Sequence, residues 1–169
     1  MTGEVEGAVV IRRIGRPGDL GWVVQAHGEL YAREFGFDSR FEAVVLEIMA
    51  SFTRRDPERE AGWIAELNGR RVGCILCVRA DDDDSGETAK LRVLLVHPDG
   101  RGHGIGGRLV DTCLAFARSV GYQRMKLWTT DQQVVAQKIY TDRGFALTGK
   151  RPNATLSATD LFYALDLTV

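Results

Sequence analysis

The residues best suited to chemistry lie in a glycine-dense turn between an apolar strand and an amphipathic helix. The turn reads Val96-His97-Pro98-Asp99-Gly100-Arg101-Gly102-His103-Gly104-Ile105-Gly106-Gly107. Such a turn leaves backbone N–H groups unpaired at a helix N-terminus, which carries roughly half a positive charge from its aligned peptide dipoles. Bare amides and that dipole together form an anion site, most often for phosphate. We therefore expect the turn to bind a phosphorylated ligand.

Three patterns of phosphate-binding loop compete for this turn. A Walker-type loop ends in Gly-Lys-Ser/Thr, which Gly106-Gly107-Arg108 does not match. A dinucleotide loop has the pattern G-x-G-x-x-G, which Gly102, Gly104 and Gly107 match, and Asp131 follows the next strand as a candidate ribose ligand. However, five residues separate the strand from the first glycine, and only about 60 residues follow the motif. These counts disfavour an NAD-dependent enzyme.

The third pattern, R-x-x-G-x-G, is present as Arg101-Gly102-His103-Gly104-Ile105-Gly106. Preceded by Leu94-Leu95-Val96-His97-Pro98, it resembles the acetyl-CoA motif of the GNAT superfamily of N-acetyltransferases. The resemblance covers nearly the whole chain, including two N-terminal helices, a hairpin and a later helix with its tyrosine. Segments 18–24, 90–96 and 127–129 also resemble the acetyltransferase half of bacterial proteins that fuse a MarR-type DNA-binding domain to a GNAT domain. We expect a stand-alone relative of that half.

The resemblance implies an acetyl-CoA-dependent N-acetyltransferase, in which a primary amine attacks the thioester directly. It implies that the strand backbone pairs with the pantetheine arm, that the amides of the turn hold the pyrophosphate, and that a backbone N–H near the strand end stabilises the oxyanion. The cofactor-binding residues implied are Leu94, Leu95, Val96, Arg101, Gly102, His103, Gly104, Ile105, Gly106 and Gln133. The family often has asparagine where Gln133 stands, so the alternative for Gln133 is to close a capping box. The alternative for Arg101 is a structural salt bridge.

Two residues are expected to move protons. The resemblance places Tyr140 where the family has its general acid, and an unperturbed phenol, with a pKa of about 10, stays protonated at neutral pH. The alternative for Tyr140 is a packed helix residue. The general base is predicted as His97, whose unperturbed pKa of about 6.5 suits the role. His27 and Glu34 on the first helix are other candidates, although His27 lies on an apolar face that favours a core histidine.

The acceptor is expected to be an amine on a small molecule or a protein. Aromatic residues that could line its pocket are Trp22, Tyr31, Phe35, Phe37 and Trp128. The rival function is a CoA-binding sensor or interaction module without turnover. Exposed sheet edges permit a homodimer.

Composition limits the remaining classes. The chain has 169 residues, which predicts one domain over 1–169, and its net charge of −1 lacks the basic excess of a nucleic-acid binder. No apolar run approaches the roughly 18 residues that span a membrane, and no basic signal-peptide region is present, so a cytoplasmic location is expected. Cys74 and Cys77 form a C-x-x-C pattern on a predicted strand, where they point to opposite faces and cannot share a metal ion. No metal is expected. The acidic run 81–84 predicts a solvated loop, against a weaker case for cation binding.

The surrounding segments predict the elements that position the turn. Strands are expected at 9–12, 62–67, 71–80, 90–96, 123–129, 145–148 and 161–167. Helices are expected from Leu20 with Asp19 as cap, from the capping box Ser39-Arg40-Phe41-Glu42, after the glycine turn, and from a second capping box at Thr130-Asp131-Gln132-Gln133. Asn68-Gly69 predicts a hairpin turn. The order predicts an α/β sandwich around one mixed sheet, and the resemblance implies a GNAT-like form of it: a mostly antiparallel sheet flanked by helices on both faces.

Overall fold

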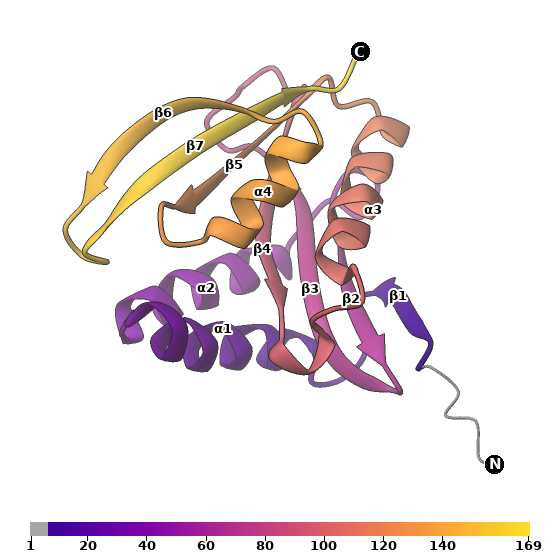
Figure 1. Cartoon of the computed structure of the whole chain (residues 1–169). Helices are drawn as coiled ribbons and strands as arrows, with labels where there is room; N and C mark the ends of the chain where they lie inside the picture. The colour runs from indigo at the N-terminus through magenta and orange to yellow at the C-terminus, as the bar shows by residue number, and fades with distance from the viewer. Residues whose placement is uncertain (1–6) are drawn as a thin grey trace.

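The computed structural model describes residues 7–169, which form a seven-stranded sheet in the order β1-β2-β3-β4-β5-β7-β6. The strands are β1 (Val9–Arg13), β2 (Ala61–Leu67), β3 (Arg70–Arg79), β4 (Thr88–Val96), β5 (Arg124–Thr130), β6 (Ala146–Asn153) and β7 (Ala158–Asp166), and the helices are α1 (Asp19–Phe35), α2 (Ser39–Phe52), α3 (Ile105–Ser119) and α4 (Val134–Asp142). Among the strands of residues 7–169, only the β4–β5 pair is parallel. Helices α1 and α2 cover one face, and α3 and α4 cover the other (Figure 1). The predicted fold class is confirmed.

Each face of the sheet buries its own apolar core. One core packs α3 and α4 against the sheet, and the other packs α1 and α2 against it. Cys77 belongs to the first core and Cys74 to the second, so the two thiols face opposite sides as predicted. Burial raises the pKa of the Cys74 thiol, as expected for a cysteine that packs as a small apolar side chain.

The sheet opens between β4 and β5. These strands pair only from Thr88 with Arg124 to Lys90 with Lys126. Beyond that point β4 carries one extra residue, because Leu95 lies opposite Cys74 while Arg92 lies opposite Leu76. Within this bulge Val93 adopts a left-handed backbone with φ 51°, a conformation rare for a β-branched residue. The bulge and the divergence leave the second half of β4 without a neighbouring strand on its β5 side.

The predicted cap of α1 is wrong. Gly18 occupies the N-cap position, and Asp19 is the first helical residue. The buried carboxylate of Asp19 instead accepts backbone N–H bonds from Gly15 and Arg16 and pairs with two guanidinium groups, those of Arg12 and Arg71. These donors outweigh the cost of burial and hold the pKa of Asp19 well below its usual range. The acid therefore ties β1 and β3 to the start of α1.

The two predicted capping boxes are also wrong in detail. Asp38 caps α2, accepting the backbone N–H of Arg40 at 2.9 Å, and Ser39 is already helical. Helix α4 starts at Val134, later than predicted, and its N-cap Gln133 makes no capping bond with its side chain. In both places a local hydrogen bond outcompetes the pattern read from sequence spacing.

Other boundaries moved by a few residues. Strand β6 continues to Asn153 and β7 begins at Ala158, because the two strands pair with each other further than expected. A 3₁₀ turn at Pro98–Gly100, which was not predicted, links β4 to the glycine turn. The hairpin at Asn68 and Gly69 is confirmed, with φ values of 53° and 75°.

Candidate active site

The glycine turn presents free backbone amides at the start of α3. Gly102 and Gly104 adopt left-handed backbone conformations, with φ 83° and 67°. Gly104 caps α3 without a side chain, and the first bond of the helix runs from the Arg108 N–H to the Gly104 carbonyl at 3.1 Å. The N–H groups of the first helical turn therefore have no helical acceptor. A Cβ atom on Gly102 or Gly104 would project into open space, so the turn is open beside these two residues.

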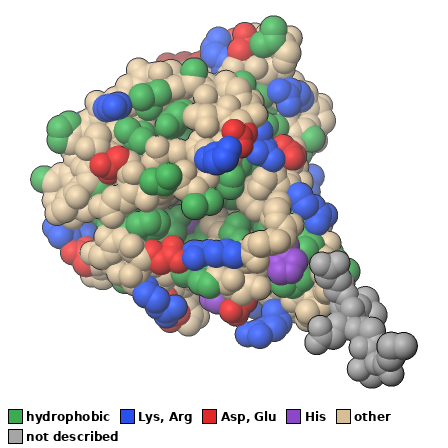
Figure 2. Space-filling model, in the orientation of Figure 1, with side chains coloured by type: hydrophobic (Ala, Val, Ile, Leu, Met, Phe, Trp, Pro, Cys, Tyr) green, Lys and Arg blue, Asp and Glu red, His purple; other side chains and the backbone are tan. Residues whose placement is uncertain are grey.

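A cleft of about 550 Å³ runs beside this turn, and we call it the donor cleft. It is bounded by α1, the end of β4, the glycine turn and the start of α4. Its lining includes Leu30, Tyr31, Glu34, Phe35, Leu94, Leu95, Val96, Arg101, Gly102, Gly104, Ile105, Gly106, Gln133 and Ile139. Apolar side chains gather around the hollow on this face of the molecule, and charged side chains flank it (Figure 2).

The β4 backbone along this cleft has hydrogen-bonding groups to offer. The His97 N–H donates to the Val72 carbonyl on β3 at 2.7 Å. Neighbouring residues of a strand point their polar groups to opposite sides, so the N–H and C=O of Val96 point toward the β5 side, where no strand pairs. An extended ligand with amide groups can bind there as an added strand would. The cleft thus offers an apolar wall, a strand edge and an anion site, a combination that fits acetyl-CoA.

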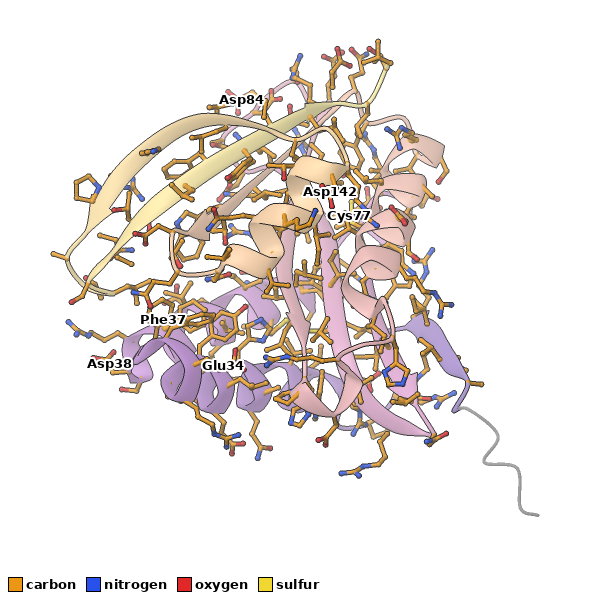
Figure 3. The ribbon with its side chains drawn as sticks, viewed as in Figure 1. Glu34, Phe37, Asp38, Cys77, Asp84 and Asp142 are labelled. Carbon is orange, nitrogen blue, oxygen red and sulfur yellow. The ribbon has the colours of Figure 1, made fainter. Side chains whose placement is uncertain are left out.

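The predicted cofactor contacts divide into two groups. The structure places Leu94, Leu95, Val96, Arg101, Gly102, Gly104, Ile105, Gly106 and Gln133 around the donor cleft. His103 does not line it; its exposed ring lies near the carbonyls of Gly100 and Arg101, at 3.3 and 3.1 Å from Nδ1. Arg101 forms an ion pair with Glu34 from the last turn of α1. Glu34 therefore lies at the donor cleft as a partner of Arg101 (Figure 3).

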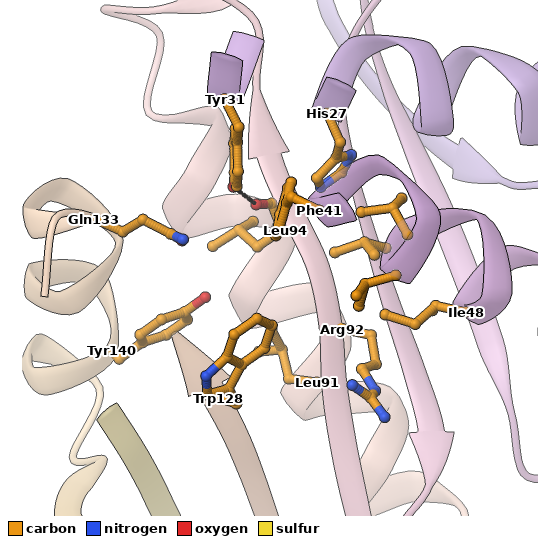
Figure 4. Close-up of a pocket in the computed structure, with 13 residues that line it drawn as sticks. His27, Tyr31, Phe41, Ile48, Leu91, Arg92, Leu94, Trp128, Gln133 and Tyr140 are labelled. Atoms are coloured by element: carbon orange, nitrogen blue, oxygen red, sulfur yellow. Dashed lines mark hydrogen bonds between the residues drawn. The ribbon is translucent and has the colours of Figure 1, made fainter. Parts of the chain in front are cut away.

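A second, smaller pocket of about 50 Å³ adjoins the donor cleft, and we call it the acceptor pocket (Figure 4). The pocket is lined by His27, Tyr31, Phe41, Val44, Val45, Ile48, Leu91, Arg92, Val93, Leu94, Trp128, Gln133 and Tyr140. Three residues, Tyr31, Leu94 and Gln133, line both spaces. The Tyr31 hydroxyl donates to the Leu94 carbonyl at 3.2 Å. The junction of the two spaces is therefore held by a hydrogen bond between α1 and the β4 bulge.

Tyr140 projects its hydroxyl into the acceptor pocket from α4 (Figure 4). The ring is buried against Phe145 and Tyr163, with centroid separations of 5.7 and 6.3 Å. Burial raises the pKa of Tyr140 well above its ordinary value, and no hydrogen bond from residues 7–169 reaches its hydroxyl. A protonated, unengaged phenol thus faces the junction of the two spaces.

Gln133 reaches the same junction but is tied to its own turn. Its Oε1 accepts from the Thr129 hydroxyl at 3.0 Å, and its Nε2 donates to the Thr130 hydroxyl at 3.3 Å. These bonds fix the connection from β5 to α4. They leave Gln133 beside the cleft with one further amide hydrogen to donate.

The three candidates for the general base lie in three different places. His97 lines a separate hollow with Trp22 and several arginines, and its Nδ1 accepts the Asp99 N–H at 3.1 Å. Glu34 lies at the donor cleft. Only His27 lines the acceptor pocket, so the structure does not bring His97 and Tyr140 together.

His27 is a buried histidine, as the sequence favoured, yet it retains one unsatisfied atom. Its Nδ1 lies 2.7 Å from the Val23 carbonyl, so Nδ1 carries the proton and Nε2 is left as an acceptor. Burial lowers the pKa of His27 to about 4. Nε2 has no partner within residues 7–169, and neither does the Trp128 indole N–H. Each unsatisfied buried group costs about 1–3 kcal/mol.

Of the aromatic residues predicted for the acceptor pocket, Tyr31 and Trp128 line it. Phe35 lines the donor cleft, while Phe37 is buried in the α1–α2 core. Sequence reasoning missed Phe41, which was expected only as an apolar position of α2, and Arg92. Arg92 carried a signal, because a charged residue inside an apolar strand has no reason to be there unless something compensates it.

Two further kinds of feature concern the described residues: membrane-spanning helices and metal-binding clusters. No helix among them is long and apolar enough to cross a bilayer. No cluster of three or more metal-binding side chains occurs in 7–169. The acidic run 81–84 lies at the opposite end of the sheet from Glu34, as the position of Asp84 shows (Figure 3).

Comparison with known proteins agrees with this geometry. The chain is 38% identical over 90 residues to N-acetyltransferase 8F1 of Rattus norvegicus and 32% identical over 100 residues to N-acetylaspartate synthetase of Danio rerio. These segments cover 53% and 59% of this chain but only 41% and 34% of those relatives, so the chain spans well under half of their length.

Solved structures share the fold over almost the whole chain. The acetyltransferase yncA from Salmonella typhimurium, solved with acetyl-CoA, has a TM-score of 0.75 at 20% identity and covers 95% of this chain and 94% of its own. An N-acetyltransferase from Staphylococcus aureus Mu50 has a TM-score of 0.77 at 18% identity, covering 95% and 99%. The model of the acetyltransferase (GNAT) family matches residues 24–145, which include the β4 bulge, the glycine turn and Tyr140. The chain therefore belongs to the GNAT family of acetyltransferases.

Proposed function

We propose that this protein is an acetyl-CoA-dependent N-acetyltransferase that transfers the acetyl group to a primary amine by direct attack on the thioester. The observation that carries the proposal is the junction of the two spaces. Tyr31, Leu94 and Gln133 border both the donor cleft and the acceptor pocket, and the Tyr140 hydroxyl points at them. A thioester whose acyl end lies at this junction is within reach of an amine in the acceptor pocket.

The backbone supplies the binding contacts. The edge of β4 at Leu94–Val96 pairs with the pantetheine amides, and the amides from Arg101 to Gly106 hold the pyrophosphate with the help of the α3 dipole. An N–H on the open side of β4, such as that of Val96, donates to the carbonyl oxygen as negative charge develops there. Gln133 is the further cofactor contact that the sequence predicted, through its remaining amide hydrogen.

Tyr140 supplies the proton for the thiolate as the C–S bond breaks, water takes the proton that the amine nitrogen loses as the amide forms, and exchange with water restores the phenol. Its raised pKa keeps the phenol protonated throughout the neutral and mildly alkaline range. A thiolate leaving into the same apolar surroundings is destabilised as well, which makes it a stronger base than it is in water. The predicted base His97 lines a separate hollow, so our proposal gives it no direct contact with the acceptor amine.

The proposal also retains two narrower expectations. One is the likeness to the acetyltransferase half of MarR–GNAT fusions, which depends on segments 18–24, 90–96 and 127–129 alone. The other is that residues 1–169 act as one domain. The rival function, a CoA-binding sensor, shares the donor cleft and differs only in turnover.

The test is release of free thiol from acetyl-CoA in the presence of a broad amine panel, with acetylated product identified by mass spectrometry. We expect equal amounts of thiol and acetylated amine with at least one member of the panel. Binding of acetyl-CoA with no thiol release for any amine would establish the sensor instead. Binding of NADH without binding of CoA would reinstate the dinucleotide interpretation.

A further inference from the structure

The acceptor pocket contains a positive charge that has no partner. Arg92 lies on β4 in the bulged segment, where its side chain is partly buried and burial lowers its pKa. Within residues 7–169 no carboxylate forms an ion pair with its guanidinium. Charged side chains are rarely left buried without a partner, because removing a charge from water has a large free-energy cost.

The nearest acidic groups are already committed to other cations. Lys90 pairs with Asp81 at 3.6 Å, and Lys126 pairs with Asp82 at 2.6 Å. Both aspartates favour the charged form of Arg92 only at longer range. Lys90, Lys126 and Arg92 therefore share two carboxylates. Arg92, which lines the acceptor pocket, is the cation left without an ion pair.

The rest of the pocket contains no negative charge to balance it. No Asp or Glu lines the acceptor pocket, and its histidine, His27, is neutral at pH 7 and offers an acceptor nitrogen. A simple ammonium ion that enters this pocket meets the like charge of Arg92. An amine that also carries an anionic group meets attraction instead. The pocket therefore suits an acceptor with both groups.

The position of Arg92 sets where that anionic group lies. In Figure 4 the guanidinium of Arg92 lies on the far side of Trp128 from the Tyr140 hydroxyl. Arg92 and Leu94 flank Val93 in the β4 bulge; Leu94 borders the junction with the donor cleft, whereas Arg92 lines the acceptor pocket alone. Phe41, Ile48 and Trp128 line the space between with apolar surface, and the volume of about 50 Å³ admits only a slim chain.

We propose that the acceptor is a primary amine joined by a slim apolar segment to a carboxylate, and that Arg92 binds this carboxylate and selects for it. This inference depends on the proposed acetyltransferase function. A planar guanidinium matches a carboxylate with two parallel N–H bonds, which makes the contact selective as well as attractive.

The test measures acetylation of unbranched ω-amino acids of increasing length, together with the ω-amino amide and the simple alkylamine of each length. For the wild type we expect KM at least tenfold lower for the acid than for the amide at the best length. In Arg92→Met this preference disappears, because KM for the acid rises to that of the amide. Arg92→Lys keeps part of the preference, because it keeps the charge without the two-pronged geometry.

The matched control is Arg54→Met, which removes the charge of an exposed arginine outside the acceptor pocket and leaves the preference intact. Melting temperatures confirm that each variant is folded. A carboxylic acid without the amine competes with the acceptor in the wild type and not in Arg92→Met, which reports binding without turnover. The inference is overturned if the wild type acetylates acid and amide equally, or if Arg92→Met keeps the preference. Failure of the proposed function is distinct, because then no amine releases thiol.

Discussion

The donor cleft and the acceptor pocket meet at three residues but are built in different ways. Apart from the Gln133 amide, the polar groups proposed to bind the cofactor in the donor cleft belong to the main chain of one continuous segment, from Leu94 through the glycine turn to the start of α3. The acceptor pocket takes its polar groups from side chains on α1, β4, β5 and α4, which are brought together only by the complete fold. The first can hold the same ligand under many side-chain changes. The polar groups of the second change whenever one of these side chains is replaced.

The two spaces also differ in how they treat charge. In our proposal the donor cleft meets the pyrophosphate with backbone amides, and its charged side chains Arg101 and Glu34 neutralise each other at the rim. The acceptor pocket has one uncompensated cation and two buried polar atoms without partners. Backbone amides are fixed by the helix and need no neighbours, whereas unpaired side chains are stable only because the surrounding core holds them. Variants in the two spaces should therefore fail in different ways.

The largest difference between the effect on turnover and the effect on acetyl-CoA affinity is expected from Tyr140→Phe, which removes one hydroxyl from the junction. Loss of a general acid lowers turnover by about 10²–10⁴-fold, and we expect roughly 10³-fold in kcat. The Kd for acetyl-CoA, measured by calorimetry, changes little because the phenyl ring remains packed. Tyr163→Phe is the control, since Tyr163 lies beside Tyr140 in the core and outside both spaces. Unchanged turnover in Tyr140→Phe would remove the proton-donor role.

The next largest effect is expected on the donor side, from Gly104→Ala. Gly104 has φ 67°, so alanine strains the turn that aims the amides, and its methyl group projects into the space beside them. We expect affinity for acetyl-CoA to fall about 100-fold, or about 2.7 kcal/mol. Gly121→Ala is the control, because Gly121 also has a left-handed backbone, φ 90°, with open space around it. If both variants bind acetyl-CoA equally well, the turn is not the pyrophosphate site.

The contrast explains which parts of the molecule could be read from the sequence. The glycine turn was predictable because glycines at left-handed positions act through local backbone geometry, which neighbouring residues encode. The succession of strands and helices along the chain and the opposite faces of Cys74 and Cys77 followed from periodicity for the same reason. The caps were mispredicted because Asp19 and Asp38 found partners that spacing alone does not reveal. The acceptor pocket was not predictable as a set, because the bulge at β4 decides where its side chains point.

A third prediction concerns the buried polar wall of the acceptor pocket. His27 has its pKa lowered to about 4, whereas an unfolded histidine titrates near 6.5. The unfolded state therefore takes up a proton over this interval and the folded state does not. Stability consequently falls as the pH drops from about 6.5 to about 4, by roughly 2 kcal/mol between pH 7 and pH 5.

Urea unfolding of the wild type at pH 7 and pH 5 measures this loss. His27→Asn keeps a donor for the Val23 carbonyl but cannot titrate, so its stability should lose that part of the pH dependence. His103→Gln, a change in an exposed histidine, should retain it. If the unfolding free energy of His27→Asn falls with pH as steeply as that of the wild type, the effect belongs to other groups. His27 would then not be the neutral, buried histidine of the pocket.

The smallest effect is expected at the rim of the donor cleft, from Glu34→Gln. The Glu34–Arg101 pair is partly exposed, so its loss should change stability by less than about 1 kcal/mol. Removing the carboxylate frees Arg101 and lowers the repulsion felt by an incoming pyrophosphate. Affinity for acetyl-CoA should then rise about two- to fivefold at low salt, and the gain should shrink at 1 M salt, where the Debye length is about 3 Å. Glu29→Gln on the same helix, outside the cleft, should show no gain. Weaker binding in Glu34→Gln would mean that the pair holds the glycine turn in its binding shape, and main-chain contacts would then depend on a side chain after all.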